Sequence, residues 1–172
     1  VLMIFPELKN IKIFSKLNLN KKTKLKEMDF IFLLSLIIID DTDNTDFFLY
    51  KFNISKKDQK RIKIIDNFYK KKINLKTFTK SNLNKVLYFD GKQATLDILN
   101  LKIIKSKKID KSLLELSNHY KKITVPLMPI SADILMAKYK IPEGRQLGIK
   151  LKMIEEEWVK NNFQISNQQV DN

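Results

Sequence analysis

Apolar and polar positions along most of this chain follow the three- and four-residue spacing of an α-helix rather than the alternation of a strand. A helix is predicted from about Pro6 to Leu17, with Pro6 in its first turn, followed by a connection over residues 18–22. The next helix is predicted from Thr23 to Ile39. Because its second half is apolar nearly all round, we expect it to be the central helix of the core.

The middle of the chain predicts shorter helices. Residues 40–46 form an acidic stretch without the central glycine and the twelfth-position glutamate of an EF-hand, so we interpret it as a solvated loop. A short helix over residues 47–54 precedes a longer one, which Ser55 caps and which ends in the lysine run of residues 70–72. Residues 74–84 are interpreted as the connection to the next helix.

Turn-forming residues divide the rest of the chain. Asp90-Gly91 is expected to separate two short helices, and another helix is predicted over residues 110–123. Ser131 then caps a helix of one to two turns. The last helix is predicted within residues 141–158, with Pro142 at its first position. Three apolar positions, Ala94, Ile98 and Leu101, should share one face of the helix that follows Gly91.

Together these elements predict an all-α fold, an irregular multi-helix array of short helices. We expect a helical body region over residues 1–125 and a helical tail region over residues 126–164, because Pro126 and Pro129 interrupt the chain between them. Residues 165–172 carry no apolar pattern and are expected to be a disordered end.

The charge of the chain favours an anionic partner. Lysine and arginine number 33 against 19 aspartates and glutamates, which gives a formal net charge of +14. Clustered basic side chains bind nucleic-acid phosphates and release their counterions. However, Arg61 and Arg145 are the only arginines, and the abundance of lysine, isoleucine and asparagine is also what an AT-rich genome produces. Charge alone therefore leaves both RNA or DNA binding and genome composition open.

Several classes of protein fit the composition poorly. The chain has no cysteine, so it offers no disulfide and no thiolate metal site, in keeping with a cytoplasmic location. The longest apolar run, residues 30–39, is about half of the ~20 residues that span a bilayer, so no membrane partner is expected. Because Val1 stands where a Met would, we expect either a fragment or a GTG start, with something missing upstream.

Two of the three glycines, Gly144 and Gly148, lie at the start of the last predicted helix. Glycine inside a helix costs about 1 kcal/mol relative to alanine, so a reason is needed. One explanation is that another helix packs closely against this face. The other is that the amides at the helix start, with Arg145 beside them, bind a phosphate. An apolar stripe continues the helix through Leu147, Leu151, Ile154 and Trp158.

The same segment resembles the C-terminal end of bacterial CCA-adding tRNA nucleotidyltransferases and the related poly(A) polymerases. The residues that carry this resemblance are Pro129, Asp133, Ile134, Leu135, Ile141, Gly144, Gly148, Glu155 and Trp158. A second segment, KVLYFDGKQATLDILNLK, is similar to another stretch of the family through Leu87, Tyr88, Gly91, Asp97 and Leu101. The segment MIFPEL near the start also looks like a step of the family. The chain departs from the family at Ser131-Ala132, where a glycine is usual, and in its acidic loop.

The resemblance implies a function in RNA 3′-end synthesis for the parent enzyme, with tRNA or another RNA as partner. Family members carry a catalytic head with Gly-Ser and Asp-x-Asp motifs, which uses Mg²⁺ and CTP or ATP. This chain has no Gly-Ser dipeptide, and its Asp41-Thr42-Asp43 follows a helix rather than a strand. We therefore expect no catalytic residue, metal or cofactor in this chain, which alone would be inactive. The alternative is a remnant of a split or decaying gene that acts as a structural partner for a separately encoded head.

The predicted RNA-binding residues are basic positions and one glycine. They are Gly144 and Arg145 at the last helix, and Lys56, Lys57, Lys60, Lys70, Lys71 and Lys72 along the helix after Ser55. A solvated lysine face is the structural alternative. The aromatic rings of Tyr69, Tyr88 and Phe89 fit either base stacking or a core position. His119 lies on a polar helix face without a recognisable catalytic partner, so we interpret it as a surface residue.

Overall fold

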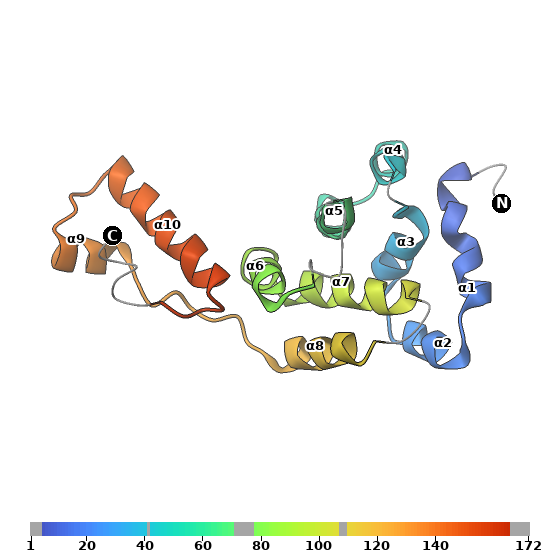
Figure 1. The fold of residues 1–172 in the computed structure, drawn as a ribbon. Helices are drawn as coiled ribbons and strands as arrows, with labels where there is room; N and C mark the ends of the chain where they lie inside the picture. The colour runs from blue at the N-terminus through green and yellow to red at the C-terminus, as the bar shows by residue number, and fades with distance from the viewer. Residues whose placement is uncertain (1–4, 41, 71–77, 107–109, 166–172) are drawn as a thin grey trace. The chain divides into compact units, whose positions relative to one another are not determined.

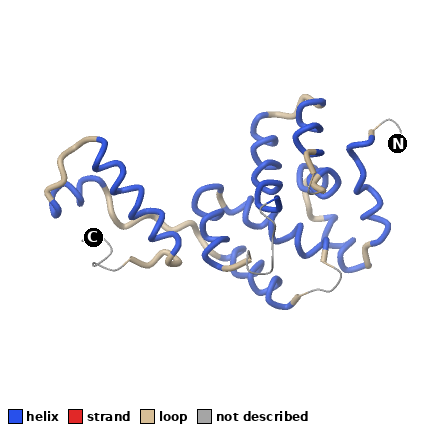
Figure 2. The backbone as a smooth tube through the Cα atoms, turned by 45° about the horizontal axis from the view of Figure 1, so that its top comes forward, coloured by secondary structure: helices blue, strands red, loops and turns tan. Residues whose placement is uncertain are grey.

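The computed structural model describes residues 5–40, 42–70, 78–106 and 110–165. Within these ranges every regular element is a helix, as Figure 2 shows, so the predicted all-α fold is confirmed. In the part of the chain that the structure describes, one 3₁₀-helix is followed by ten α-helices, whose order along the chain can be followed in Figure 1. Their bounds are η1 Pro6–Lys12, α1 Ile13–Lys16, α2 Leu19–Lys26, α3 Phe30–Ile38, α4 Asn44–Lys51, α5 Lys56–Lys70, α6 Lys80–Asp90, α7 Lys92–Lys105, α8 Lys111–Lys122, α9 Ala132–Tyr139 and α10 Arg145–Lys160.

The chain divides into two compact units. The first contains residues 1–75 and 93–122, and the second contains residues 76–92 and 123–172. The second unit thus includes α6, a segment that the expected division at residue 125 assigned to the body region. Apart from Ile165, the expected disordered end lies outside the described residues.

The first unit is built on apolar faces of α3, α5 and α7. Helix α3 packs against η1, α4 and α5 (Figure 1). The fully buried side chains of this unit include Phe32, Leu36, Ile38, Ile62, Ile65, Ile98 and Leu101. In α7, nine of 14 residues are buried, the predicted face of Ala94, Ile98 and Leu101 among them. The sequence placed the centre of the core in α3, and α7 proves to be at least as deeply buried.

Two predictions near the N-terminus are wrong, and side-chain caps explain both. Residues 18–22 are not a connection, because the Asn18 side chain accepts a hydrogen bond from the Lys21 amide at 3.0 Å and begins α2. The predicted long helix from Thr23 to Ile39 is interrupted, since Asp29 accepts from the Phe32 amide at 2.9 Å and begins α3. A side chain that satisfies an otherwise unpaired amide favours a new helix start at its own position.

Two further helices begin earlier than predicted. Helix α4 includes the second half of the expected acidic loop, where the Asn44 side chain donates to the Glu7 and Ile38 carbonyls at 2.9 and 2.8 Å. Helix α6 begins at Lys80, inside the expected connection of residues 74–84, because Thr79 caps it by accepting from the Asn82 amide at 3.3 Å. The predicted caps Ser55 and Ser131 are confirmed, each accepting from the amide three residues on.

The two glycines at α10 differ in backbone conformation, because Gly144 has a positive φ and Gly148 does not. Helix α10 starts at Arg145, so the prediction that Pro142 holds the first helical position is wrong. Gly144 is the N-cap with φ 147°, a conformation that residues with side chains rarely adopt. Beyond the chain neighbours and the backbone of the same helix, no described atom lies within 4 Å of a Cβ built on either Gly144 or Gly148. Close packing of another helix therefore does not account for them.

The second unit has an apolar cluster and an aromatic one. Leu135, Leu147 and Ile154 are buried together, and Leu151 packs against them, which confirms the predicted stripe of α10. Helix α6 packs on α10. There the Tyr88 hydroxyl donates to Glu155 Oε1 at 2.6 Å, and its ring meets the Trp158 ring edge-on at a centroid distance of 5.4 Å. Burial and this hydrogen bond raise the pKa of Tyr88 to about 12.

Candidate nucleic-acid interface

The predicted lysines at the start of α5 are exposed. Lys56, Lys57 and Lys60 lie in its first two turns and form no ion pair with any described residue. The turn is fixed by Ser55, whose hydroxyl oxygen accepts from the Asp58 amide at 3.2 Å. These three ammonium groups are therefore available to a polyanion on the surface of the first unit.

The C-terminal end of α5 has a different electrostatic environment. Lys70 Nζ lies 2.9 Å from Asp66, 3.2 Å from Asp46 and 3.7 Å from Asp43. The hydrogen bond to the buried Asp66 carboxylate is the main reason that the pKa of Lys70 rises to about 12. Lys70 stays a predicted RNA contact, but three carboxylates already share its charge. Lys71 and Lys72 lie outside the described residues.

The remaining predicted residues lie in the other unit. Gly144 caps α10, and the exposed Arg145 follows it with no ion pair among the described residues. Lys56, Lys57 and Lys60 thus belong to the first unit, whereas Arg145 belongs to the second.

The aromatic candidates differ in accessibility. Tyr69 is half-buried and its hydroxyl donates to the Ile98 carbonyl at 2.9 Å, whereas Tyr88 belongs to the aromatic cluster with Trp158. Phe89, at 52% exposure, presents a ring to solvent. His119 is exposed, as expected, and meets the ring of Tyr120 edge-on at 5.1 Å.

An open cleft in the first unit was not predicted from the sequence. Its volume is about 890 Å³, and it is lined by η1, α1, the start of α2, Asp40 and the end of α7. Five of the lining residues are lysines, and one is an acid: Lys9, Lys12, Lys16, Lys21, Lys105 and Asp40. Ile13, Leu17 and Ile104 supply apolar wall, and no aromatic side chain is among its described lining residues.

Hydrogen bonds to backbone carbonyls hold two of these lysines. Lys21 is buried at 7% exposure, and its Nζ donates to the Ile104 carbonyl at 2.9 Å and to the Ser106 carbonyl. Lys105 Nζ donates to the Ile39 carbonyl at 2.6 Å. Carbonyls at the end of α7 carry the negative end of the helix dipole, which favours the Lys21 ammonium there. No described carboxylate forms an ion pair with Lys21.

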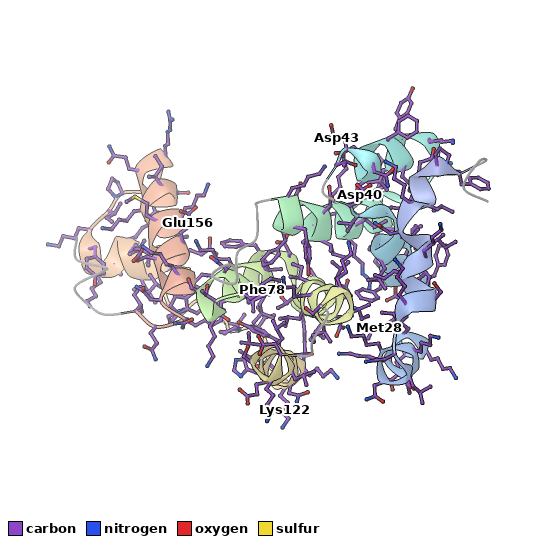
Figure 3. The ribbon with its side chains drawn as sticks, turned by 45° about the vertical axis from the view of Figure 1, so that its right-hand side comes forward. Met28, Asp40, Asp43, Phe78, Lys122 and Glu156 are labelled. Atoms are coloured by element: carbon purple, nitrogen blue, oxygen red, sulfur yellow. The ribbon has the colours of Figure 1, made fainter. Side chains whose placement is uncertain are left out.

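The other charges of the cleft are more exposed. Lys12 and Lys16 are exposed and form no ion pair with a described residue. Lys9 Nζ lies 3.8 Å from Asp40, the acid of the cleft, which Figure 3 labels beside the N-terminal helices. The Asp40 carboxylate also accepts from the Thr42 amide at 3.2 Å and from its hydroxyl at 2.5 Å. The cleft is thus strongly positive.

Some of the lysines that line this cleft could be predicted from the sequence to lie together. Lys9, Lys12 and Lys16 are spaced by three and four residues, which places them on one face of the predicted first helix. Lys21 and Lys105 reach the cleft only through the tertiary fold, since Lys21 and Ile104 are 83 positions apart in sequence.

In the described ranges no group of three or more His, Cys, Asp or Glu side chains is arranged to hold a metal ion. None of the helices described has both the length and the apolar character needed to cross a membrane. No protein-family model, curated protein or solved structure matches the chain.

Proposed function

We propose that this chain is a non-catalytic RNA-binding portion of an enzyme similar to the CCA-adding tRNA nucleotidyltransferases and poly(A) polymerases. It grips the sugar-phosphate backbone of tRNA, while a head outside this sequence adds nucleotides to the 3′ end. The observation that carries the RNA-binding proposal is the set of exposed basic side chains without a carboxylate partner among the described residues, Lys56, Lys57, Lys60 and Arg145. Side chains of this kind bind phosphates irrespective of base sequence.

The arrangement of the second unit supports the choice of RNA. The two segments that resemble the nucleotidyltransferase family are far apart in sequence, yet Tyr88 from one contacts Glu155 and Trp158 from the other. Residues that make a family resemblance and also contact one another are consistent with a shared structural unit. A body and tail of this type would hold the acceptor end of tRNA toward the head.

Binding of fluorescently labelled tRNA, measured by anisotropy, tests this function. We expect saturable binding that weakens as salt rises, because phosphate contacts release counterions. Arg145→Ala should weaken binding while leaving the helical circular dichroism signal unchanged. Wild-type chain that does not bind tRNA, or binds it with no dependence on salt, would overturn the proposal. Unchanged affinity in Arg145→Ala would remove that residue from the contacts.

A further inference from the structure

The cleft between η1, α1, α2 and the end of α7 has the properties of a polyanion site. Its volume of about 890 Å³ falls within the ~300–1,000 Å³ range of ligand sites. Lysines line it from three separate stretches of the chain, Lys9 to Lys16, Lys21 and Lys105. A concave surface lined by one sign of charge focuses the electric field, which a convex helix face does not do to the same degree.

Lys21 is the feature that distinguishes this cleft from a solvated lysine face. A lysine with only 7% exposure gives up most of its hydration, and such a burial is usually compensated by a carboxylate. Here carbonyl oxygens of Ile104 and Ser106 replace the carboxylate. An ammonium group has three donors, so one N–H remains after these two bonds. Its positive charge is fixed in place, lines the cleft and is not neutralised by an ion pair with any described residue.

Lys12 and Lys16 extend this positive surface along one helix face. Both are exposed, both line the cleft, and neither forms an ion pair in the described part of the chain. Their spacing of four residues places them about one helical turn apart. Successive phosphates of a nucleic-acid backbone could therefore contact Lys12 and Lys16, with the fixed charge of the buried Lys21 adding to the field of the cleft.

The absence of aromatic side chains from the described lining decides the mode of recognition. Single-stranded binding sites use aromatic rings on which bases stack. The cleft instead offers lysines and the aliphatic side chains of Ile13, Leu17 and Ile104. Such a lining contacts phosphate and sugar without reading the base, which is backbone recognition.

We propose that this cleft is the principal phosphate-binding site of the chain and that it takes the sugar-phosphate backbone of RNA. The inference rests on the proposed function, because it names the site at which the RNA is held. It also assigns the predicted lysines of α5 a smaller share of the binding than Lys12, Lys16 and Lys21.

Two matched double variants of the full chain test the site. Lys12→Gln/Lys16→Gln removes two exposed cleft lysines, and Lys56→Gln/Lys60→Gln removes two exposed lysines of the same spacing on α5. Each phosphate contact contributes about 0.9 to the slope of log K against log salt. We therefore expect the salt dependence of the cleft variant to be less steep than that of the wild type by about 2 in this slope. If the variant and the wild type bind tRNA equally at 1 M salt, the variant should bind about 60-fold more weakly at 0.1 M salt. The α5 variant should lose less.

The outcomes separate this inference from the proposed function. If wild-type chain binds tRNA and the α5 variant loses as much affinity as the cleft variant or more, RNA binding stands and the cleft assignment is overturned. If wild-type chain does not bind tRNA, both proposals fail. Inorganic tripolyphosphate is the control ligand. If, per phosphate group, it displaces labelled tRNA at a lower concentration than unlabelled tRNA does, the cleft is a site for free polyphosphate instead. Thermal melts confirm that both double variants remain folded.

Discussion

Two regions of the first unit contain lysines whose surroundings differ. At the end of α5, Lys70 lies among the carboxylates of Asp43, Asp46 and Asp66, so its charge is compensated within the protein. In the cleft, Lys21 is equally well held, but by carbonyl oxygens that carry no full charge. The comparison teaches that the surroundings of a lysine, rather than the local number of lysines, decide whether its charge is available to a partner.

Two aspartates only three positions apart belong to the two different regions. Asp40 lines the cleft, whereas Asp43 lies near Lys70. Figure 3 labels the two aspartates. The short segment that joins α3 to α4 thus contributes Asp40 to the cleft and Asp43 to the surroundings of Lys70. Substitutions that exchange the two environments, or remove one of them, are the most direct way to test the comparison.

The largest effect is expected from Lys70→Met. Its removal leaves the Asp66 carboxylate, 3% exposed, without its ion-pair partner. Removing one member of a buried pair costs about 3 kcal/mol in the free energy of unfolding. The matched control is Lys63→Met on the same helix, whose exposed pair with Asp46 should contribute under about 1 kcal/mol. Chemical denaturation measures both.

The same Lys70→Met variant should leave tRNA affinity nearly unchanged, because the charge of Lys70 is already shared with carboxylates. If it weakens tRNA binding as strongly as Lys12→Gln/Lys16→Gln does, the distinction between the two regions is wrong.

The second-largest effect on stability is expected from acid, which should lower the melting temperature of the protein. The hydrogen bond from Lys70 holds the pKa of Asp46 below its usual range, and the bond from Lys51 lowers the pKa of Glu7. A carboxylate whose folded pKa is depressed contributes stability that is complete above its unfolded pKa of about 4 and is lost as pH falls through the folded value. The melting temperature should therefore decrease below about pH 4. The acid dependence should be flatter in Lys70→Met, and equal dependence in both proteins would contradict this assignment.

The smallest predicted effect has the opposite sign. Asp40→Asn removes the acid of the cleft but keeps a side-chain oxygen that accepts from Thr42. Loss of one repulsive charge near a phosphate is worth about 1 kcal/mol in water, so tRNA affinity should rise about fivefold. Asp46→Asn is the matched control and should leave the affinity unchanged. An affinity that falls in Asp40→Asn would place the RNA away from this cleft.

The helical fold could be predicted from hydrophobic spacing, while helix boundaries depended on caps that spacing does not include. Asp29 directly precedes an apolar run, and reading it as an N-cap would have divided the predicted long helix at the right residue. Asn18 carries the same information for α2. Gly144 is unusual by its position in the sequence, but its positive φ depends on the turn into α10, which hydrophobic spacing does not describe.

The candidate site was predictable only in part. Exposure of Lys56, Lys57 and Lys60 followed from their position in a capped helix. The pairing of Lys70 depends on Asp43 and Asp46, which reach it from another helix and its preceding turn. The cleft brings Lys21 to the end of α7, a contact between residues distant in sequence. No local pattern contains such long-range contacts.

The measurement that tests the central claim most directly is lysine footprinting of the chain with and without tRNA. Acetylation by a water-soluble ester, read by mass spectrometry, reports each exposed amine separately. If the cleft holds the RNA backbone, tRNA should protect Lys12 and Lys16 more strongly than Lys56 and Lys60, and protection should vanish at high salt. Equal or greater protection on α5, with Lys12 and Lys16 still reactive, would contradict the account.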